Sequence, residues 1–371
     1  MNKHNTQSTL NTFVFITIAL SSGCGAITTV PSPTSTPASA QTPSETTTPS
    51  PLNTSETIHP EGKLIYYKEN AVYSLDLQTH ITSIIFSTGW PQYNPIFINN
   101  FYYFTNGGDV FRVNIYKPLV EQITLDIKPI YFYDISPDNK YLAYTDQLDQ
   151  EIAILDIENN ASAIIPQAKG YEYSSPSWSP NSKSLLYFES PKTPIKLYGR
   201  LFLYSFENEK AIELLPEKGI YLIAPKWSPD GKNIVLNMAD SQTGKPGIYL
   251  LNLESNNINL IEENATGNKI SWSPMGDKIL YLNDQLTLFE SSNKTEIIAK
   301  STKDRSVLDA TWSPDGKFIG YLTCSMYTVN SGPNQGFRAL DSCIFTIKDI
   351  VTNDVLDIEI PITRAVFWIH K

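Results

Sequence analysis

A signature of five residues recurs from position 135 towards the C-terminal end of the chain. Each copy has a large apolar residue, then Ser-Pro, then usually Asp or Asn, then a residue suited to a sharp turn. The copies are Ile135–Asn139, Trp178–Ser182, Trp227–Gly231, Trp272–Gly276 and Trp312–Gly316. Their prolines, Pro137, Pro180, Pro229, Pro274 and Pro314, are 43, 49, 45 and 40 residues apart. A period in the forties is typical of a four-stranded blade, so the spacing predicts a β-propeller.

The signature has the chemistry of a tight hairpin turn. Proline presets φ at the first corner, Asp or Asn hydrogen-bonds locally, and Gly adopts positive φ at the exit. Asn139 tolerates that conformation, whereas Ser182 is less suited to it, so we expect a looser turn in the fourth blade. The recurring acids Asp138, Asp230 and Asp315 are interpreted as turn residues. The signature tryptophans are interpreted as core residues rather than ligand stackers: Trp178, Trp227, Trp272 and Trp312.

Two core positions follow each signature. A branched aliphatic stands five residues after each proline, at Leu142, Leu185, Ile234, Ile279 and Ile319. Seven residues after it stand Tyr144, Tyr187, Leu236, Tyr281 and Tyr321. Positions two apart on a strand share a face, so each repeat points both side chains into one layer of the core.

The number of blades can be counted from the third strands. Seven segments fit this strand: Ala71–Leu77, Asp109–Ile115, Glu151–Ile157, Arg200–Phe206, Gly247–Leu253, Gln285–Phe289 and Cys343–Asp349. Tyr93–Phe97 and Phe101–Phe104 fit the first two strands of a blade without the signature. Lys63–Tyr67 is a second strand with no first strand before it, and Arg364–Ile369 is a first strand with no second after it. Their pairing would close one all-β propeller of seven four-stranded blades, with six or eight as alternatives.

The N-terminal region has the pattern of an export signal. Phe13–Leu20 is an apolar run too short to span a bilayer as a helix, and Ser21–Cys24 resembles a bacterial lipobox. We expect residues 1–23 to be a signal peptide and Cys24 to be lipidated; ordinary signal cleavage is the alternative. Residues 24–59 are rich in Pro, Ser and Thr, which predicts a disordered tether, and the propeller is expected over 60–371.

Two further cysteines remain, Cys324 and Cys343. Their spacing is not that of a metal site, and the chain is expected to be exported, so we predict a disulfide between them. They flank a long segment that contains Ser331–Gly336. The alternative is a pair of unpaired buried thiols.

The repeat resembles the TolB-type, WD40-like propeller repeat, and the resemblance covers about residues 62–369. It implies a propeller fold. Proteins with this repeat include the periplasmic component of the Tol-Pal system, propeller domains of prolyl-oligopeptidase-like enzymes and many lipoproteins of unknown function. The Tol-Pal component is similar but carries an α/β domain where this chain has a tether. The motif is specific for fold and weak for function.

Few residues suited to catalysis occur in the predicted mature chain. Its histidines are His59, His80 and His370, and there is no Gly-x-Ser-x-Gly elbow, metal-binding motif or P-loop. We therefore expect no enzymatic activity, no metal and no cofactor. The net charge is −10 and no Lys/Arg run stands out, so we expect no nucleic-acid partner. Four acids could face the channel, although no spacing pairs them: Asp134, Asp240, Asp309 and Asp341.

Three long insertions join second to third strands: Ser190–Gly199, Met238–Pro246 and Thr323–Asp341. Such connections emerge on the face opposite the signature turns, and loops on a rigid scaffold commonly carry binding residues. The candidate contact residues are Tyr327, Asn330, Asn334, Phe337 and Arg338. The alternative is a decorated rim without a ligand.

Together these features predict a monomeric, non-enzymatic lipoprotein of the bacterial envelope, on the periplasmic or extracellular side. It would contact the membrane only through its anchor and bind an envelope protein, peptide or glycan through the loop-rich face. The alternative is a polysaccharide hydrolase or lyase that uses channel carboxylates, with or without Ca²⁺. The scarcity of histidine favours binding.

Overall fold

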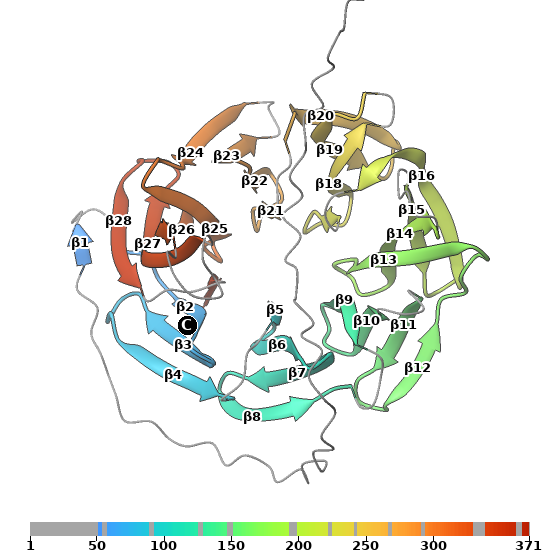
Figure 1. Cartoon of the computed structure of the whole chain (residues 1–371), viewed down its shortest axis with the longest axis horizontal. Helices are drawn as coiled ribbons and strands as arrows, with labels where there is room; N and C mark the ends of the chain where they lie inside the picture. Colours follow the sequence, from blue (N-terminus) through green and yellow to red (C-terminus); the bar gives the residue numbers. More distant parts are fainter. Residues whose placement is uncertain are drawn as a thin grey trace, which may run out of the picture. The chain divides into compact units, whose positions relative to one another are not determined.

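The computed structural model describes residues 51–53, 58–88, 93–124, 129–146, 151–192, 199–221, 225–240, 243–265, 269–290, 294–328, 338–360 and 366–370. These residues form β-strands and turns, with no helix among them. Seven four-stranded antiparallel blades are arranged in a ring around a central axis, with the first strand of each blade innermost (Figure 1). The prediction of a seven-bladed all-β propeller is therefore confirmed.

The blades follow one another in chain order, and each runs from an inner to an outer strand. Blade 1 consists of β29 (Val366–Ile369), β2 (Lys63–Lys68), β3 (Ala71–Asp76) and β4 (Thr82–Ser87), and blade 2 of β5 (Tyr93–Ile98), β6 (Phe101–Asn106), β7 (Asp109–Asn114) and β8 (Lys117–Gln122). Blade 3 consists of β9 (Ile130–Ile135), β10 (Tyr141–Asp146), β11 (Ile152–Asp156) and β12 (Ala161–Ile164). Blade 4 consists of β13 (Tyr171–Trp178), β14 (Ser184–Pro191), β15 (Gly199–Ser205) and β16 (Lys210–Tyr221). Blade 5 consists of β17 (Lys226–Trp227), β18 (Asn233–Asp240), β19 (Pro246–Asn252) and β20 (Asn257–Glu263). Blade 6 consists of β21 (Lys269–Trp272), β22 (Lys278–Leu282), β23 (Gln285–Glu290) and β24 (Thr295–Lys300). Blade 7 consists of β25 (Arg305–Trp312), β26 (Phe318–Thr328), β27 (Arg338–Asp349) and β28 (Val355–Ile360).

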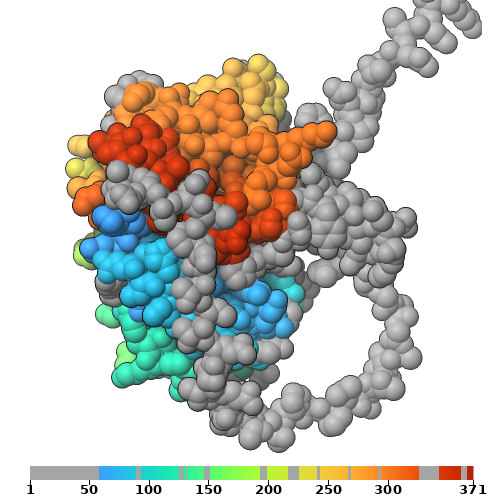
Figure 2. Space-filling model, turned by 90° about the vertical axis from the view of Figure 1, so that its left-hand side faces the viewer, coloured from blue at the N-terminus to red at the C-terminus, as the bar shows by residue number. Residues whose placement is uncertain are grey.

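The ring closes by pairing the two ends of the propeller. β29 pairs antiparallel with β2, with Lys63 opposite Ile369 and Tyr66 opposite Val366. In Figure 2 the blue strands of the first blade and the red C-terminal part of the chain lie side by side. Closure removes the exposed edges that an open ring would leave, as the terminal strand patterns predicted.

The two predicted core positions are confirmed. The aliphatic side chains after the signature are 0–1% exposed. Each packs in the same cluster as the residue two positions later, for example Leu185 with Tyr187 and Ile279 with Tyr281. Blade 1 repeats the pattern without a signature, because Leu64 and Tyr66 occupy the matching positions.

The signature turns are uniform. In each, the serine hydroxyl donates to a nearby Asp or Asn side chain and accepts the backbone N–H five residues further on. Ser182 adopts φ 59°, and its N–H donates to the Ser179 carbonyl at 2.9 Å, like Gly231 to Ser228. The expectation of a looser fourth turn was therefore wrong, since serine accepts the left-handed conformation once this network is formed.

Two features of the strands were not predicted. β16 continues past its own blade and pairs with β18, which joins blades 4 and 5 into one sheet, while β17 has only two residues. β1 (Pro51–Asn53), within the predicted tether, pairs with β28 as a fifth strand of blade 7. Ile58, also assigned to the tether, is 6% exposed and lies in the core between blades 7 and 1.

Candidate functional site

The two faces of the propeller carry different connections. The signature turns join first to second strands at one face. The connections from β14 to β15, from β18 to β19 and from β26 to β27 join second to third strands, so they emerge at the opposite face. The prediction that the three insertions share one face follows from this antiparallel order. We call it the loop-rich face.

A cavity of about 520 Å³, the channel pocket, lies among the inner strands of blades 1, 2, 6 and 7. Each inner strand begins at the loop-rich face, so Tyr93, Lys269 and Val366, which begin their strands, place the pocket towards that face. Its other lining residues are Tyr67, Asn94, Pro95, Tyr102, Ile270, Ser271, Leu280, Leu286, Asp309, Ala310, Thr311 and Phe367.

An ion pair spans two blades in the channel pocket. Lys269 Nζ lies 3.4 Å from Asp309 Oδ1. The Asp309 side chain is 10% exposed, and it accepts the N–H groups of Ala310, at 3.0 Å, and Val366. Burial raises the pKa of this carboxyl, and the lysine and the amides oppose that shift. Lys269, with a side chain 49% exposed, presents its charge to the open pocket.

Asp134 ties blades 3 and 4 together. It lies on β9, and its two oxygens accept the N–H groups of Trp178, at 2.8 Å, and Ile135, at 2.9 Å. Burial raises its pKa to about 6, although these amides and the charge of Lys226 oppose the shift. The carboxylate satisfies a backbone donor on the neighbouring inner strand, which has no strand partner on its channel side.

The four candidate channel acids are therefore separated. Asp134 and Asp309 lie on inner strands of blades 3 and 7, and of the two only Asp309 lines the channel pocket. Asp240 ends β18, and Asp341 lies in β27, in the second and third strands of their blades. Of the two acids whose side chains the structure describes, Asp134 contacts blade 4 and Asp309 contacts Lys269 of blade 6.

The predicted disulfide is confirmed. Cys324 and Cys343 are bonded and lie directly opposite each other on β26 and β27, with a Cα–Cα distance of 4.1 Å. Arg305 Nη2 donates to the carbonyls of Thr323, at 2.7 Å, and Ser342, at 3.2 Å. The base of this long hairpin is therefore fixed to the inner strand β25.

Two of the candidate contact residues lie in the paired strands of this hairpin, beyond the disulfide. Tyr327 is in β26 opposite Ala339, and Arg338 begins β27 opposite Thr328. Asn330, Asn334 and Phe337 lie outside the described residues, as does Cys24.

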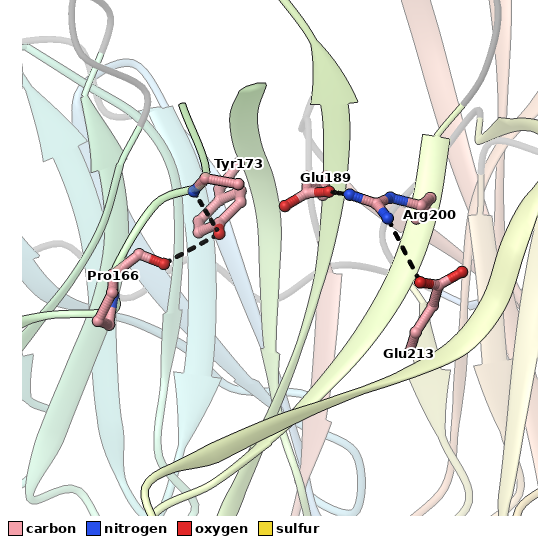
Figure 3. A network of polar contacts seen from close by, with 6 residues as sticks. Pro166, Tyr173, Glu189, Arg200 and Glu213 are labelled. Carbon is pink, nitrogen blue, oxygen red and sulfur yellow. Dashed lines mark hydrogen bonds and ion pairs between the residues drawn. The ribbon is translucent and has the colours of Figure 1, made fainter. Parts of the chain in front are cut away.

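A charged network in blade 4 was not predicted from the sequence. Glu189 is 2% exposed and pairs with Arg200, whose Nη1 lies 3.4 Å from Glu213 Oε2 (Figure 3). The guanidinium lies over the rings of Tyr171 and Phe202, with centroids at 5.0 and 5.2 Å. No signal in the sequence marks it, because the three charged residues are brought together only by strand pairing across β14, β15 and β16.

The signature tryptophans are packed between blades. Trp178 and Trp312 are 5% and 7% exposed, which confirms them as core residues. Trp227 and Trp272 are half-buried, and their indole N–H groups donate to the carbonyls of Ser177, at 3.2 Å, and Lys226, at 3.0 Å, in the preceding blades. All four serve the contacts between neighbouring blades.

Other candidate groups are dispersed. His59 and His370 are exposed, and His80 occupies a turn with φ 57°. Within the described ranges, no three His, Cys, Asp or Glu side chains gather in a group that could hold a metal ion. The same ranges contain no helix long and apolar enough to cross a membrane.

Known proteins resemble this chain mainly in fold. A family model described as eukaryotic translation initiation factor eIF2A matches residues 170–332. No curated protein matches the sequence. An oligogalacturonate lyase in complex with manganese has a TM-score of 0.52 and 11% identity, covering 81% of this chain and 98% of the lyase.

Two further structures are similar. A protein described as a dipeptidyl aminopeptidase IV from Bacteroides ovatus has a TM-score of 0.52 and 12% identity; the match covers 80% of this chain but only 51% of the longer protein. TolB from Acinetobacter baumannii has a TM-score of 0.46 and 15% identity, covering 84% of this chain and 67% of TolB. The two structures with a TM-score of 0.52 support the β-propeller fold of this chain. At these identities the likeness concerns the fold alone.

Proposed function

We propose that this TolB-like propeller is a binding protein, and that it holds a peptide, a glycan or a protein segment of the envelope at the loop-rich face. The observation that supports this most is the channel pocket, which opens among the inner strands and offers one half-exposed cation, Lys269. Concave pockets with a few convergent polar groups are the usual form of a ligand site.

The chemistry of the pocket favours an anionic group on the ligand. The carboxylate of Asp309 already accepts two backbone N–H groups, so it can remain stable while Lys269 turns to a ligand. Tyr67 and Tyr93 add aromatic surface with hydroxyl groups, which suits peptide backbones and sugar rings alike. A carboxylate on a peptide or an acidic sugar would pair with Lys269 in a protein whose net charge is −10.

Binding can be tested with envelope extract and a glycan array. Replacing Lys269 by Ala is expected to weaken capture of the ligand about tenfold or more, because a hydrogen bond to a charged group is lost. Tyr93→Ala, at a side chain 49% exposed, should also weaken it without removing a buried group. Lys232→Ala, in a signature turn on the opposite face, is the matched control and should bind normally. Equal binding by the wild type and all three variants would contradict the proposed site.

One observation favours catalysis as a second candidate. Asp309 lines the pocket, and burial raises its pKa, as in many general acids. Turnover of a polysaccharide that is abolished by Asp309→Asn, with folding retained, would replace the binding proposal by a hydrolase or lyase. Binding without turnover is the outcome that the binding proposal predicts.

We also propose that Cys24 carries a lipid that anchors the chain to a bacterial membrane. This rests on the apolar run and the lipobox-like Ser21–Cys24. Cys24→Ser should move the protein into the soluble fraction, whereas unchanged membrane retention would contradict the anchor.

A further inference from the structure

The outer edges of the seven blades differ in regularity. In five blades the pairing of the third with the fourth strand contains a register shift. The pairs β11–β12 and β27–β28 run without one. Bulges are one of the devices that keep an exposed edge from pairing with another strand. Blades 3 and 7 therefore present the two regular outer edges.

One of these two edges already carries an added strand. β1 lies outside β28 and pairs with it antiparallel, with Pro51 opposite Ile358 (Figure 1). A regular outer edge of this propeller can thus accept an extended segment. β12, in contrast, is the last strand of its sheet.

β12 has the composition of an accepting edge. Its residues Ala161–Ile164 are all exposed, and they include neither a charge nor a proline, unlike β8, which begins with Lys117 and Pro118. Ile165 donates its N–H to the Ile152 carbonyl, towards β11. The alternation of an antiparallel ladder then directs the amides of Ser162 and Ile164 outward, where a further strand can pair.

A cavity of about 750 Å³ adjoins this edge. It is lined by the five consecutive residues 161–165 and, across the gap between blades, by the aromatic side chains Trp178, Tyr204 and Phe206. Trp178 stacks on Phe206 with ring centroids 4.9 Å apart, which gives the blade 4 wall a continuous aromatic surface. Ile164, at 59% exposed, adds apolar surface on the strand itself.

The charges around the cavity are mainly acidic. Asp156, Glu207 and Glu209 line it, against the single cation Lys183. This distribution matches a ligand with basic side chains. The chain's own segment 24–57 does not match it, since that segment contains Glu45 and Glu56 but no lysine or arginine.

We propose that β12 is a docking site for an extended segment of a partner protein, in which apolar residues are flanked by Lys or Arg. The segment adds to blade 3 as a fifth strand, places an apolar side chain in the cavity against Phe206 and Tyr204, and directs its basic residues to Glu207 and Glu209. Main-chain pairing gives affinity and the cavity gives selectivity, as in other cases of strand addition. This site is separate from the channel pocket and does not depend on it.

The first test uses a labelled peptide, acetyl-Lys-Val-Phe-Val-Lys-Val-amide, and fluorescence polarisation with the intact protein. We expect binding that saturates below about 1 mM. Methylating the peptide's backbone nitrogens on one edge should weaken it about threefold to tenfold for each ladder bond lost, with the protein unchanged. No binding up to that concentration, or no effect of methylation on either edge, would overturn the proposal.

The second test uses charge reversal with a matched control. Glu207→Lys should weaken binding of the basic peptide about twofold to fivefold and improve binding of the version with Glu in place of Lys. Glu254→Lys is at the corresponding exposed turn position of blade 5. It should leave the binding of both peptides unchanged. Equal effects of both variants would overturn the site. So would concentration-dependent dimers that vanish when residues 24–57 are removed, because they would assign this edge to a second copy of the chain.

Discussion

At the scale of single residues, Asp134 shows how a conspicuous acid can serve the scaffold. Its position on an inner strand is compatible with a catalytic role, yet both its oxygens accept backbone N–H groups, one of them from the next blade. A carboxylate of this kind stabilises the contact between blades 3 and 4. Its raised pKa records the cost of keeping that charge buried.

Replacing Asp134 by Asn should reveal this cost in the pH dependence of stability. The folded-state pKa, about 6, lies above the ordinary value of 3.8, so the folded state binds the proton more tightly than the unfolded state does. The contribution of Asp134 to the free energy of unfolding is therefore greatest below about pH 4 and falls as pH rises to 6. Urea titration measures the free energy of unfolding of each protein. The value for wild type minus the value for Asp134→Asn should fall as pH rises over that range. A difference that grows with pH would refute this assignment.

The turns at Ser182 and Gly231 allow a reciprocal exchange. Both residues have positive φ, 59° and 72°, in matching signature turns. Gly231→Ser should lower the free energy of unfolding by about 1 kcal/mol. Ser182→Gly should raise it by less, because it also removes the hydroxyl that accepts the Asp138 N–H at 3.2 Å. Thermal unfolding measures both. Two changes of the same sign would show that φ does not govern these positions.

At the scale of elements, the hairpin of β26 and β27 depends on the covalent bond at its base. The disulfide closes a loop with a sequence separation of 19 residues. Replacing both Cys324 and Cys343 by Ala should lower the free energy of unfolding by about 2–4 kcal/mol. Wild type in a reducing agent should behave like the variant. Equal stability of the oxidised wild type and the variant would contradict a structural role for this bond.

The sequence predicted those elements whose pattern is local. The signature turns, the core positions after them and the terminal strands of the ring are each specified by a few neighbouring residues, such as Ser228 with Asp230. The additions could not be predicted in this way. The extension of β16 onto β18 and the pairing of β1 with β28 depend on edges that exist only after the blades have formed.

The candidate site was predictable only in part, for the same reason. The repeat placed the insertions on one face, and Asp309 was noted as a channel acid. Its partner Lys269 carries no motif, and the two are 40 positions apart in the sequence. Their contact arises because they occupy matching positions on the inner strands of adjacent blades, four residues before Ser273 and Ser313.

At the scale of the whole molecule, stability depends on closing the ring at β29. Trp368 is 7% exposed, packs between blades 7 and 1, and donates its indole N–H to the Glu61 carbonyl at 2.8 Å. Trp368→Ala should lower the free energy of unfolding by about 3–5 kcal/mol. Trp272→Ala, at a half-buried tryptophan away from the closure, should cost less. A larger loss at Trp272 would contradict the importance of closure.

The central claim, that a ligand binds in the channel pocket towards the loop-rich face, can be tested by site-specific crosslinking. A photoreactive amino acid placed at Tyr93, in the channel pocket, or at Lys232, in a signature turn, samples the two faces in turn. Irradiation in envelope extract should give a discrete crosslinked product from position 93 and none from position 232. A product from position 232 with none from position 93 would contradict the claim.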